Sequence, residues 1–207
     1  DLHFLGIDNV LVLRGDARKA DKDFVPTPGG HAYATDLLQH VKDMNRGKYL
    51  HEDLESSECT DFCVGVAGYP EKHFEAPNFE TDFKYLKKKV ELGADFIVTQ
   101  MFFDNNRYKA FVERCRAEGI TIPIIPGLKP ITSARQLMTL PKIFHIDIPL
   151  ELSEAINACR TSEQVRQVGI EWMVHQCREL MAFGVPVLHF YTMGNPAPTR
   201  QIVEQLF

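Results

Sequence analysis

The sequence predicts an α/β protein built on a parallel sheet, and three observations support that prediction. Short apolar runs alternate with amphipathic helical segments along the chain. The apolar runs are nearly continuous in their apolar character, which is typical of strands that are covered on both faces. Parallel strands need a helical crossover between them, and the helical segments lie between the apolar runs, as such crossovers require.

Five runs are predicted as strands because each is short and rich in β-branched or aromatic residues. They are Asn9 to Leu13, Phe62 to Ala67, Phe96 to Phe103, Ile122 to Ile125 and Val185 to Tyr191. The first run leads directly into Arg14, Gly15 and Asp16. A cation, a flexible residue and an anion therefore follow the carboxyl end of a strand, which is where α/β enzymes bind their ligands.

Three helices have readable ends. Thr81 is predicted to cap the first, which places Phe83, Leu86 and Val90 on one face and ends at Gly93. The second contains Tyr108, Phe111, Val112 and Cys115 and ends at Gly119, and the third opens on a capping box of Thr161 and Gln164 and ends at Gly184.

Five strands in 207 residues fit either a small open sheet or the last five units of an eightfold barrel. Polar and aromatic residues follow several of the predicted strands, which favours the barrel. The chain contains neither GxGxxG nor GxxxxGK[ST], so the common phosphate-binding open sheets lose support. We therefore expect one domain over residues 1–207 that forms an incomplete (β/α)8 TIM barrel.

The composition excludes several classes of partner. The net charge is -5 and the pI is near 5.9, which disfavours binding to nucleic acid or to an anionic membrane. No apolar stretch approaches the roughly 20 residues that span a bilayer, and no secretion leader is evident, so a cytoplasmic location is expected. The five scattered cysteines show no CxxC spacing and no HExxH occurs, which indicates reduced thiols and no metal site.

Five blocks of sequence resemble the methylenetetrahydrofolate reductase family in their order and spacing. They are LRGD at Leu13 to Asp16, YPEKHFEA at Tyr69 to Ala76, LKKKVELGADFIVTQMFF at Leu86 to Phe103, IPIIPGLKPI at Ile122 to Ile131 and HFYT at His189 to Thr192. The resemblance implies a flavin-containing TIM barrel that uses FAD. It also implies ping-pong reduction of 5,10-methylenetetrahydrofolate to 5-methyltetrahydrofolate, with NADH or NADPH as the electron source.

The same resemblance implies a role in tetrahydrofolate interconversion and methionine biosynthesis, and a homo-oligomer at full length. It identifies the LRGD strand as the fourth of eight. The chain is therefore expected to lack the first three βα units, together with the glutamate that protonates the folate. Its fold is expected to comprise roughly strands 4 to 8 with their helices.

Site residues follow from the resemblance position by position. Arg14 and Gly15 match residues that contact FAD, where a guanidinium can hold a phosphate or carbonyl and glycine permits close approach. Asp16 matches the catalytic aspartate between flavin and folate, where it can stabilise the iminium cation and hydrogen-bond the pterin. Tyr33 and Ala34 match a further segment near the cofactor.

Tyr69, His73 and Ala76 match another flavin-contacting segment of the family. A further set of matches is expected to hold the ribose and pyrophosphate of FAD, namely Asp82, Lys88 and Lys89. Gln100 matches a glutamine that contacts folate and nicotinamide in turn, and Gln136 matches a second substrate-contacting glutamine. The amide of a glutamine suits both substrates because it offers a donor and an acceptor.

The chain departs from the family at four positions. Leu140 stands where some members have a phenylalanine that stacks on folate, and Tyr85 replaces an asparagine of the FAD site. Gly194 and Asn195 stand where an asparagine and an arginine are usual. These changes bear on how the folate tail is held and leave the expected reaction as it is.

Two other functions are compatible with the residues. A truncated barrel could be a noncatalytic fragment, because missing strands leave open sheet edges and exposed apolar surface. The chain could also be an unrelated phosphate-binding TIM-barrel enzyme that forms a Schiff base. That chemistry needs a lysine within a strand, whereas Lys129 lies between a strand end and a proline.

Overall fold

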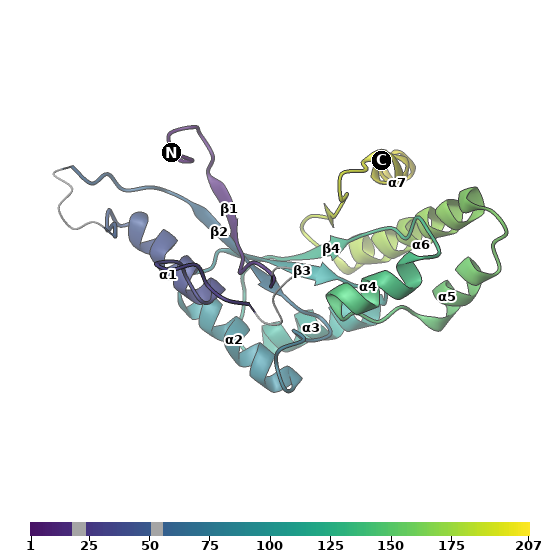
Figure 1. The fold of residues 1–207 in the computed structure, drawn as a ribbon, viewed down its shortest axis with the longest axis horizontal. Helices are drawn as coiled ribbons and strands as arrows, with labels where there is room; N and C mark the ends of the chain where they lie inside the picture. The colour runs from purple at the N-terminus through teal and green to yellow at the C-terminus, as the bar shows by residue number, and fades with distance from the viewer. Residues whose placement is uncertain (18–23, 51–55) are drawn as a thin grey trace. The chain divides into compact units, whose positions relative to one another are not determined.

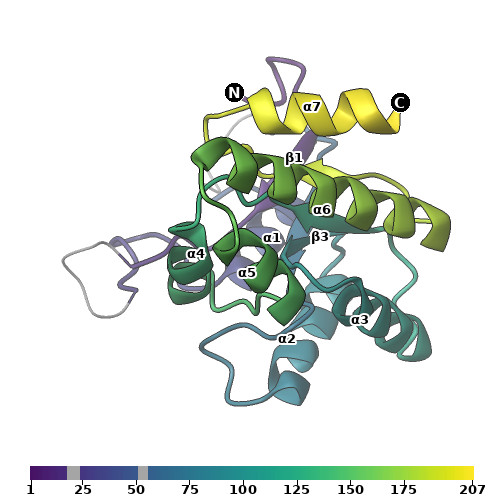
Figure 2. The same cartoon turned by 90° about the vertical axis from the view of Figure 1, so that its right-hand side faces the viewer.

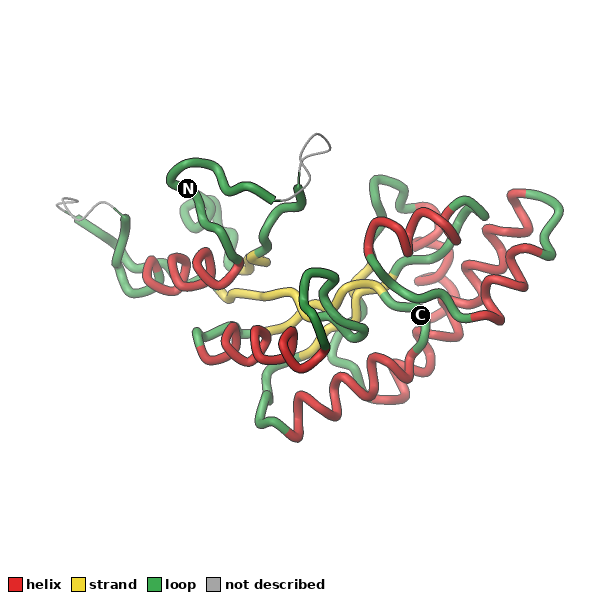
Figure 3. The backbone as a smooth tube through the Cα atoms, turned by 60° about the horizontal axis from the view of Figure 1, so that its bottom comes forward, coloured by secondary structure: helices red, strands yellow, loops and turns green. Residues whose placement is uncertain are grey.

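The computed structural model describes residues 1–17, 24–50 and 56–207. It divides into two compact units, which are Asp1–Ala67 with Phe83–Ile97 and Gly68–Asp82 with Val98–Phe207. Five strands form one sheet in the chain order β1-β2-β3-β4-β5. Figure 1 labels these elements, and the secondary-structure colours of Figure 3 show strands and helices in alternation. The predicted α/β class is confirmed.

The first unit is built around β1 (Asn9–Val12), α1 (Ala34–Met44) and most of β2 (Cys63–Gly68). β1 and β2 are parallel, with Val12 opposite Val66. The helix α1 buries Leu38 and Val41 in this unit. The unit also contains the larger part of α2 (Phe79–Glu91), whose Phe83 and Leu86 are buried as predicted.

The second unit contains the carboxyl-terminal part of β3 (Phe96–Met101) and the elements that follow it. These are α3 (Asn105–Ala117), β4 (Ile124–Leu128), α4 (Gln136–Phe144), α5 (Leu150–Asn157), α6 (Ser162–Phe183), β5 (His189–Phe190) and α7 (Ala197–Leu206). β4 and β5 are parallel, with Gly127 opposite His189. α6 packs against α5 on one side and α7 on the other (Figure 2).

A hydrophobic core in the second unit joins the end of β3 to the helices after β4. Its fully buried members are Met101, Phe103, Ile131, Leu140, Ile146, Leu152, Ile156 and Val165. Leu140, where the resemblance implies a folate-stacking phenylalanine in some members, therefore packs inside the protein. Its side chain is only 5% exposed, so it provides no surface platform.

Several predicted boundaries are confirmed by their capping contacts. The Gln164 backbone N–H donates to Thr161 Oγ1 and the Thr161 backbone N–H donates to Gln164 Oε1, both at 3.2 Å, which completes the capping box of α6. Gly184, which ends α6, has a φ of 90°. That left-handed conformation is the one in which glycine is favoured over other residues.

Other predictions were wrong. α2 begins at Phe79, so Thr81 lies inside the helix, and Asn78 caps it by accepting from the Thr81 backbone N–H at 2.8 Å. β1 ends at Val12 and is not covered on both faces, since Leu11 and Leu13 are exposed. Among the described strands, β1 is an edge strand and pairs with β2 alone. The fifth strand is shorter than predicted and comprises His189–Phe190. The helices α1, α4, α5 and α7 were not predicted.

We predict that Gly169→Ala destabilises the protein. Gly169 lies within α6, and a Cβ atom there would overlap the backbone oxygen of Ile131. Alanine normally stabilises a helix interior relative to glycine, so a loss of stability would come from this overlap. We expect the free energy of unfolding to fall by about 2 kcal/mol, measured by urea denaturation.

Gly15→Ala is the matched control, because the nearest atom to a Cβ at Gly15 is Phe24 Cε2 at 4.0 Å. Both substitutions restrict the unfolded chain in the same way. Equal stability of the two variants would contradict the proposed close contact between α6 and Ile131.

Candidate functional site

Two cations lie at the same edge of the first unit. Arg14 follows β1 two residues after Val12, and its guanidinium carbon is 4.9 Å from the centre of the Phe24 ring. Lys89 Nζ donates a hydrogen bond of 2.9 Å to the backbone oxygen of Ala67, next to the register partner of Val12. The two side chains therefore lie at the carboxyl ends of neighbouring parallel strands. The sequence predicted this position for Arg14 and not for Lys89.

Gly15 and Asp16 continue this edge and are exposed. A Cβ atom at Gly15 would meet only Phe24, at van der Waals distance. The described residues therefore leave room for a Cβ atom at this position and do not by themselves require glycine. The expected need for close approach concerns a bound ligand and stays a prediction.

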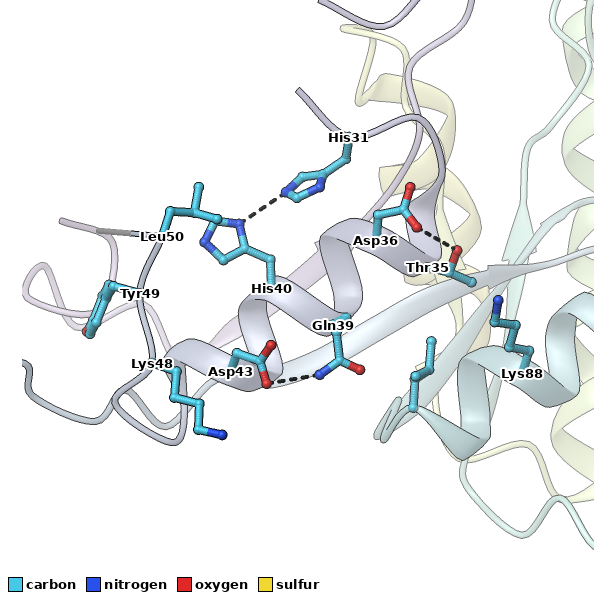
Figure 4. A pocket seen from close by; sticks show the side chains of 11 residues that line it. His31, Thr35, Asp36, Gln39, His40, Asp43, Lys48, Tyr49, Leu50 and Lys88 are labelled. Carbon is cyan, nitrogen blue, oxygen red and sulfur yellow. Dashed lines mark hydrogen bonds between the residues drawn. The ribbon is translucent and has the colours of Figure 1, made fainter. Parts of the chain in front are cut away.

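Tyr33 and Ala34 form the start of α1. The Tyr33 backbone N–H donates to Asp36 Oδ2 at 3.0 Å, which orders the first turn, and the Tyr33 side chain is 63% exposed. Asp36 also lines a pocket of about 470 Å³ in the first unit, to which Lys88 contributes (Figure 4). Lys88 therefore lies beside α1.

The same pocket contains a pair of histidines that sequence reasoning missed. His31 Nε2 and His40 Nδ1 are 3.0 Å apart, and Gln39 Nε2 donates to Asp43 Oδ1 at 2.9 Å (Figure 4). The lining carries both signs of charge, since Asp36 and Asp43 lie with Lys48 and Lys88. It therefore selects no single class of charged ligand.

In the second unit, the loop after β2 brings four predicted residues together. The rings of Tyr69 and His73 meet edge to face, with their centres 4.7 Å apart. Asp82 Oδ2 accepts from the His73 backbone N–H at 3.0 Å, and the Ala76 backbone N–H donates to the His73 backbone oxygen. One continuous stretch of chain, residues 69–82, thus brings these four residues together around His73.

Lys72 holds this loop in shape and was not predicted. Its Nζ donates to the backbone oxygens of Ala76 at 2.6 Å and His73 at 3.2 Å. Its φ is 137°, which side-chain-bearing residues rarely adopt, so the loop stores strain where it presents His73. The Glu75 backbone N–H donates to His73 Nδ1, so the proton of a neutral His73 ring lies on Nε2.

Glu71 connects the same loop to the segment after α4, and the sequence analysis did not predict this contact. Its Oε2 accepts from the Asp147 backbone N–H at 3.0 Å, while its Oε1 is buried and has no partner among the described residues. Burial raises the pKa of this carboxyl from 4.5 to about 6. Nearby, the Phe74 and His145 rings are stacked with their centres 4.6 Å apart.

The two predicted glutamines of the second unit both accept backbone hydrogen bonds with their side-chain oxygens. Gln100 is half-buried at the end of β3, and its Oε1 accepts from the Met101 backbone N–H at 2.9 Å. Gln136 Oε1 accepts from the Thr132 backbone N–H at 2.6 Å, which fixes the start of α4. A substrate contact by Gln136 would therefore have to use its amide nitrogen.

Lys129 follows β4 directly and is 7% exposed. Burial lowers the pKa of its amine. The prediction that Lys129 lies outside the strand is confirmed, whereas its burial was not expected. Within residues 1–17, 24–50 and 56–207, no cluster of His, Cys, Asp and Glu side chains is suited to a metal ion. No helix in those ranges is long and apolar enough to span a bilayer.

These features define an α/β protein in which several of the predicted site residues follow the carboxyl ends of strands. A sequence model of the methylenetetrahydrofolate reductase family matches residues 1–207, so the chain belongs to that family. It is 38% identical to methylenetetrahydrofolate reductase 1 of Schizosaccharomyces pombe, over 99% of this chain and 32% of that protein. It is 38% identical to methylenetetrahydrofolate reductase (NADH) 1 of Zea mays, over 91% of this chain and 31% of that protein.

A third relative is the probable methylenetetrahydrofolate reductase (NADPH) of Caenorhabditis elegans. It is 31% identical over 98% of this chain and 28% of that protein. The chain thus spans about a third of the length of these relatives. Because the chain belongs to this family, the alternative of an unrelated phosphate-binding TIM-barrel enzyme is set aside.

We predict that Glu71→Gln makes the protein more stable above pH 6. Because the folded state raises the pKa of Glu71, its contribution to stability is complete below about pH 4.5 and is lost as the pH rises through about 6. Glutamine imitates the protonated acid at every pH. We expect a gain of about 1 kcal/mol at pH 7 in urea denaturation, falling toward zero near pH 4.

Glu113→Gln, an exposed substitution on α3, is the control for general charge effects. A difference between Glu71→Gln and the wild type that stays constant from pH 4 to pH 7 would show that Glu71 does not titrate in this range.

Proposed function

We propose that the full-length protein containing this chain reduces 5,10-methylenetetrahydrofolate to 5-methyltetrahydrofolate. FAD is its cofactor, and NADH or NADPH supplies the electrons in a ping-pong sequence. The family match over residues 1–207 supports the reaction. The observation that carries the site is the placement of Arg14 and Lys89 at one edge of β1 and β2.

The residues fit FAD by their chemistry. A dinucleotide carries two phosphates, and without a glycine-rich loop these need cationic side chains, which Arg14, Lys88 and Lys89 supply. Tyr69 and His73 offer an aromatic face and an Nε2–H donor for a ring and a ribose. Tyr33, Ala34, Ala76 and Asp82 complete the proposed binding set, with Gly15 allowing close approach. When bound, FAD would accept a hydride from the nicotinamide and pass it to the folate.

Asp16 is the proposed catalytic residue. It is exposed after β1, where its carboxylate can stabilise the cation that forms when the methylene bridge of the folate opens. It can also accept a hydrogen bond from the pterin. In the second unit, Gln100 would hold the pterin edge and then the nicotinamide carboxamide, and Gln136 would contact substrate through its amide nitrogen.

The proposal also places the chain in its barrel. The five strands correspond to strands 4 to 8 of a (β/α)8 domain, and the general-acid glutamate belongs to a strand outside residues 1–207. The relatives include proteins named for NADH and for NADPH, which supports both as electron donors. We further propose that the enzyme is cytoplasmic, forms a homo-oligomer and serves methionine biosynthesis.

The test is the absorbance of the purified full-length protein between 350 and 500 nm, a range chosen for oxidised flavin. We expect a flavin spectrum that NADH or NADPH bleaches without folate. Addition of 5,10-methylenetetrahydrofolate should then restore the colour in the absence of oxygen. A protein that is colourless and cannot be reconstituted with FAD would refute the proposal.

We predict that Asp16→Asn slows the folate half-reaction by about a hundredfold, because it removes the charge that stabilises the cation. The flavin content and its reduction by NAD(P)H should change much less. Stopped-flow absorbance measures the two half-reactions separately. A variant that loses FAD but reoxidises at the wild-type rate once reconstituted would contradict the role of Asp16.

A further inference from the structure

A row of four aromatic rings connects the loop of residues 69–76, called the flavin loop below, to the segment after α4. The Tyr69 and His73 rings have their centres 4.7 Å apart, and His73 stacks on Phe74 at 4.9 Å. Phe74 in turn stacks on His145, with centres 4.6 Å apart and ring planes inclined by 19°. A movement at His145 is therefore passed to Tyr69 and His73 by direct ring contacts.

Glu71 makes a second connection between the same two segments. Its Oε2 accepts from the Asp147 backbone N–H at 3.0 Å, across 76 positions of the chain. We call the four residues Glu71, Phe74, His145 and Asp147 the latch. All of them belong to the second unit. The latch thus holds the flavin loop to residues 145–147 by one hydrogen bond and one ring stack.

The flavin loop has its own internal hydrogen bonds, which do not involve the latch. Lys72 Nζ donates to the backbone oxygens of Ala76 at 2.6 Å and His73 at 3.2 Å. The Ala76 backbone N–H donates to the His73 backbone oxygen at 3.0 Å. These bonds maintain the shape of the loop, whereas the latch fixes its position against residues 145–147. Opening the latch would therefore move the loop as one body.

The surroundings of Glu71 oppose a negative charge. Its Oε1 is buried and has no hydrogen-bond donor among the described residues. The charged groups that face it are Asp104 and Arg107 at the start of α3 and Asp147 after α4. Arg107 Nη2 also lies 4.0 Å from Asp147 Oδ2, so its charge is shared. Burial outweighs the Asp147 N–H and Arg107, and it raises the pKa of Glu71 from 4.5 to about 6.

This environment makes the closed latch depend on pH. Opening would return the Glu71 carboxyl to water, where it ionises at its ordinary pKa. The contribution of Glu71 to closure is therefore complete below about pH 4.5 and is lost as the pH rises through about 6. A difference of 1.5 between the two pKa values corresponds to roughly a thirtyfold increase in the opening equilibrium when Glu71 is fully ionised.

We propose that Glu71 and Phe74 are positioning residues of the proposed cofactor site. The latch holds Tyr69 and His73 against bound FAD, and ionisation of Glu71 opens the latch so that FAD leaves more rapidly. This inference rests on the proposed function, because it takes the flavin loop to contact FAD. Glu71 and Phe74 act on the cofactor through His73 and Tyr69.

The first test is the rate at which the full-length, flavin-loaded protein releases FAD, followed by flavin fluorescence after dilution. We expect the rate to rise roughly tenfold from pH 5 to pH 7.5, because the latch opens as Glu71 ionises. In Glu71→Gln the release should stay slow and the rise with pH should be absent, since an amide does not ionise in this range. Circular dichroism checks that each variant is folded.

Three further variants separate Glu71 from other groups. His145→Asn removes the second titratable side chain of the latch, and asparagine tolerates the left-handed φ of 53° at this position. Release should be faster in this variant but should still rise with pH. Phe74→Ala interrupts the row of rings and should speed release at pH 5 severalfold. Glu113→Gln, an exposed substitution on α3, should behave as the wild type.

Hydrogen exchange tests the latch without FAD. The Asp147 backbone N–H is protected while it donates to Glu71, and mass spectrometry of a peptide that contains Asp147 follows its exchange. The wild type and Glu71→Gln are compared at the same pH, so the intrinsic pH dependence of exchange cancels. We expect the ratio of the two exchange rates, wild type over variant, to be roughly tenfold larger at pH 7.5 than at pH 5.

Two results would overturn the inference. One is a rate of FAD release that is independent of pH or that rises equally in Glu71→Gln. The other is an exchange ratio that is the same at pH 5 and pH 7.5. A full-length protein that binds no FAD would refute the proposed function and the cofactor role of the latch with it. The exchange ratio would then still show whether Glu71 controls the flavin loop.

Discussion

Thr99 links three strands of the second unit, and the placement of the residues beyond them depends on this link. Its hydroxyl oxygen accepts from the Gly127 backbone N–H at 2.9 Å, and its backbone oxygen accepts from the Tyr191 hydroxyl at 2.8 Å. Gly127 leaves room for the Tyr191 ring, because a Cβ there would lie 2.6 Å from Tyr191 Cε2. The ends of β3, β4 and β5 are thereby fixed in one layer, from which Gln100 and Lys129 follow.

The loops beyond the strands are held by polar contacts, so their precision comes from hydrogen bonds more than from apolar packing. In the first unit, Lys89 bonds to the end of β2. In the second, Lys72, Asp82 and Glu71 hold the loop that carries His73. Buried, strained and desolvated groups of this kind are common at functional sites. The core of Ile131, Leu140 and Ile146 supports this arrangement from within.

The sequence predicted the fold class and the groups at the strand ends, because apolar runs and helix caps are local signals. The capping box of Thr161 and Gln164 is an example. It did not predict that β1 would be an exposed edge, since pairing is set by neighbours in space. The buried hydrogen bond between Asn105 and Gln176 joins residues that are 71 positions apart. The burial of Glu71 likewise depends on a distant segment, so no local pattern could have identified it.

The most direct test of the account is a crystal structure of the full-length protein with FAD bound. The account predicts that the phosphates of FAD lie within hydrogen-bond distance of Arg14 and of Lys88 or Lys89, at the carboxyl ends of β1 and β2. It also predicts that Asp16 faces the isoalloxazine ring. FAD bound at the amino ends of these strands, or bound without contact to Arg14 and Lys89, would contradict it.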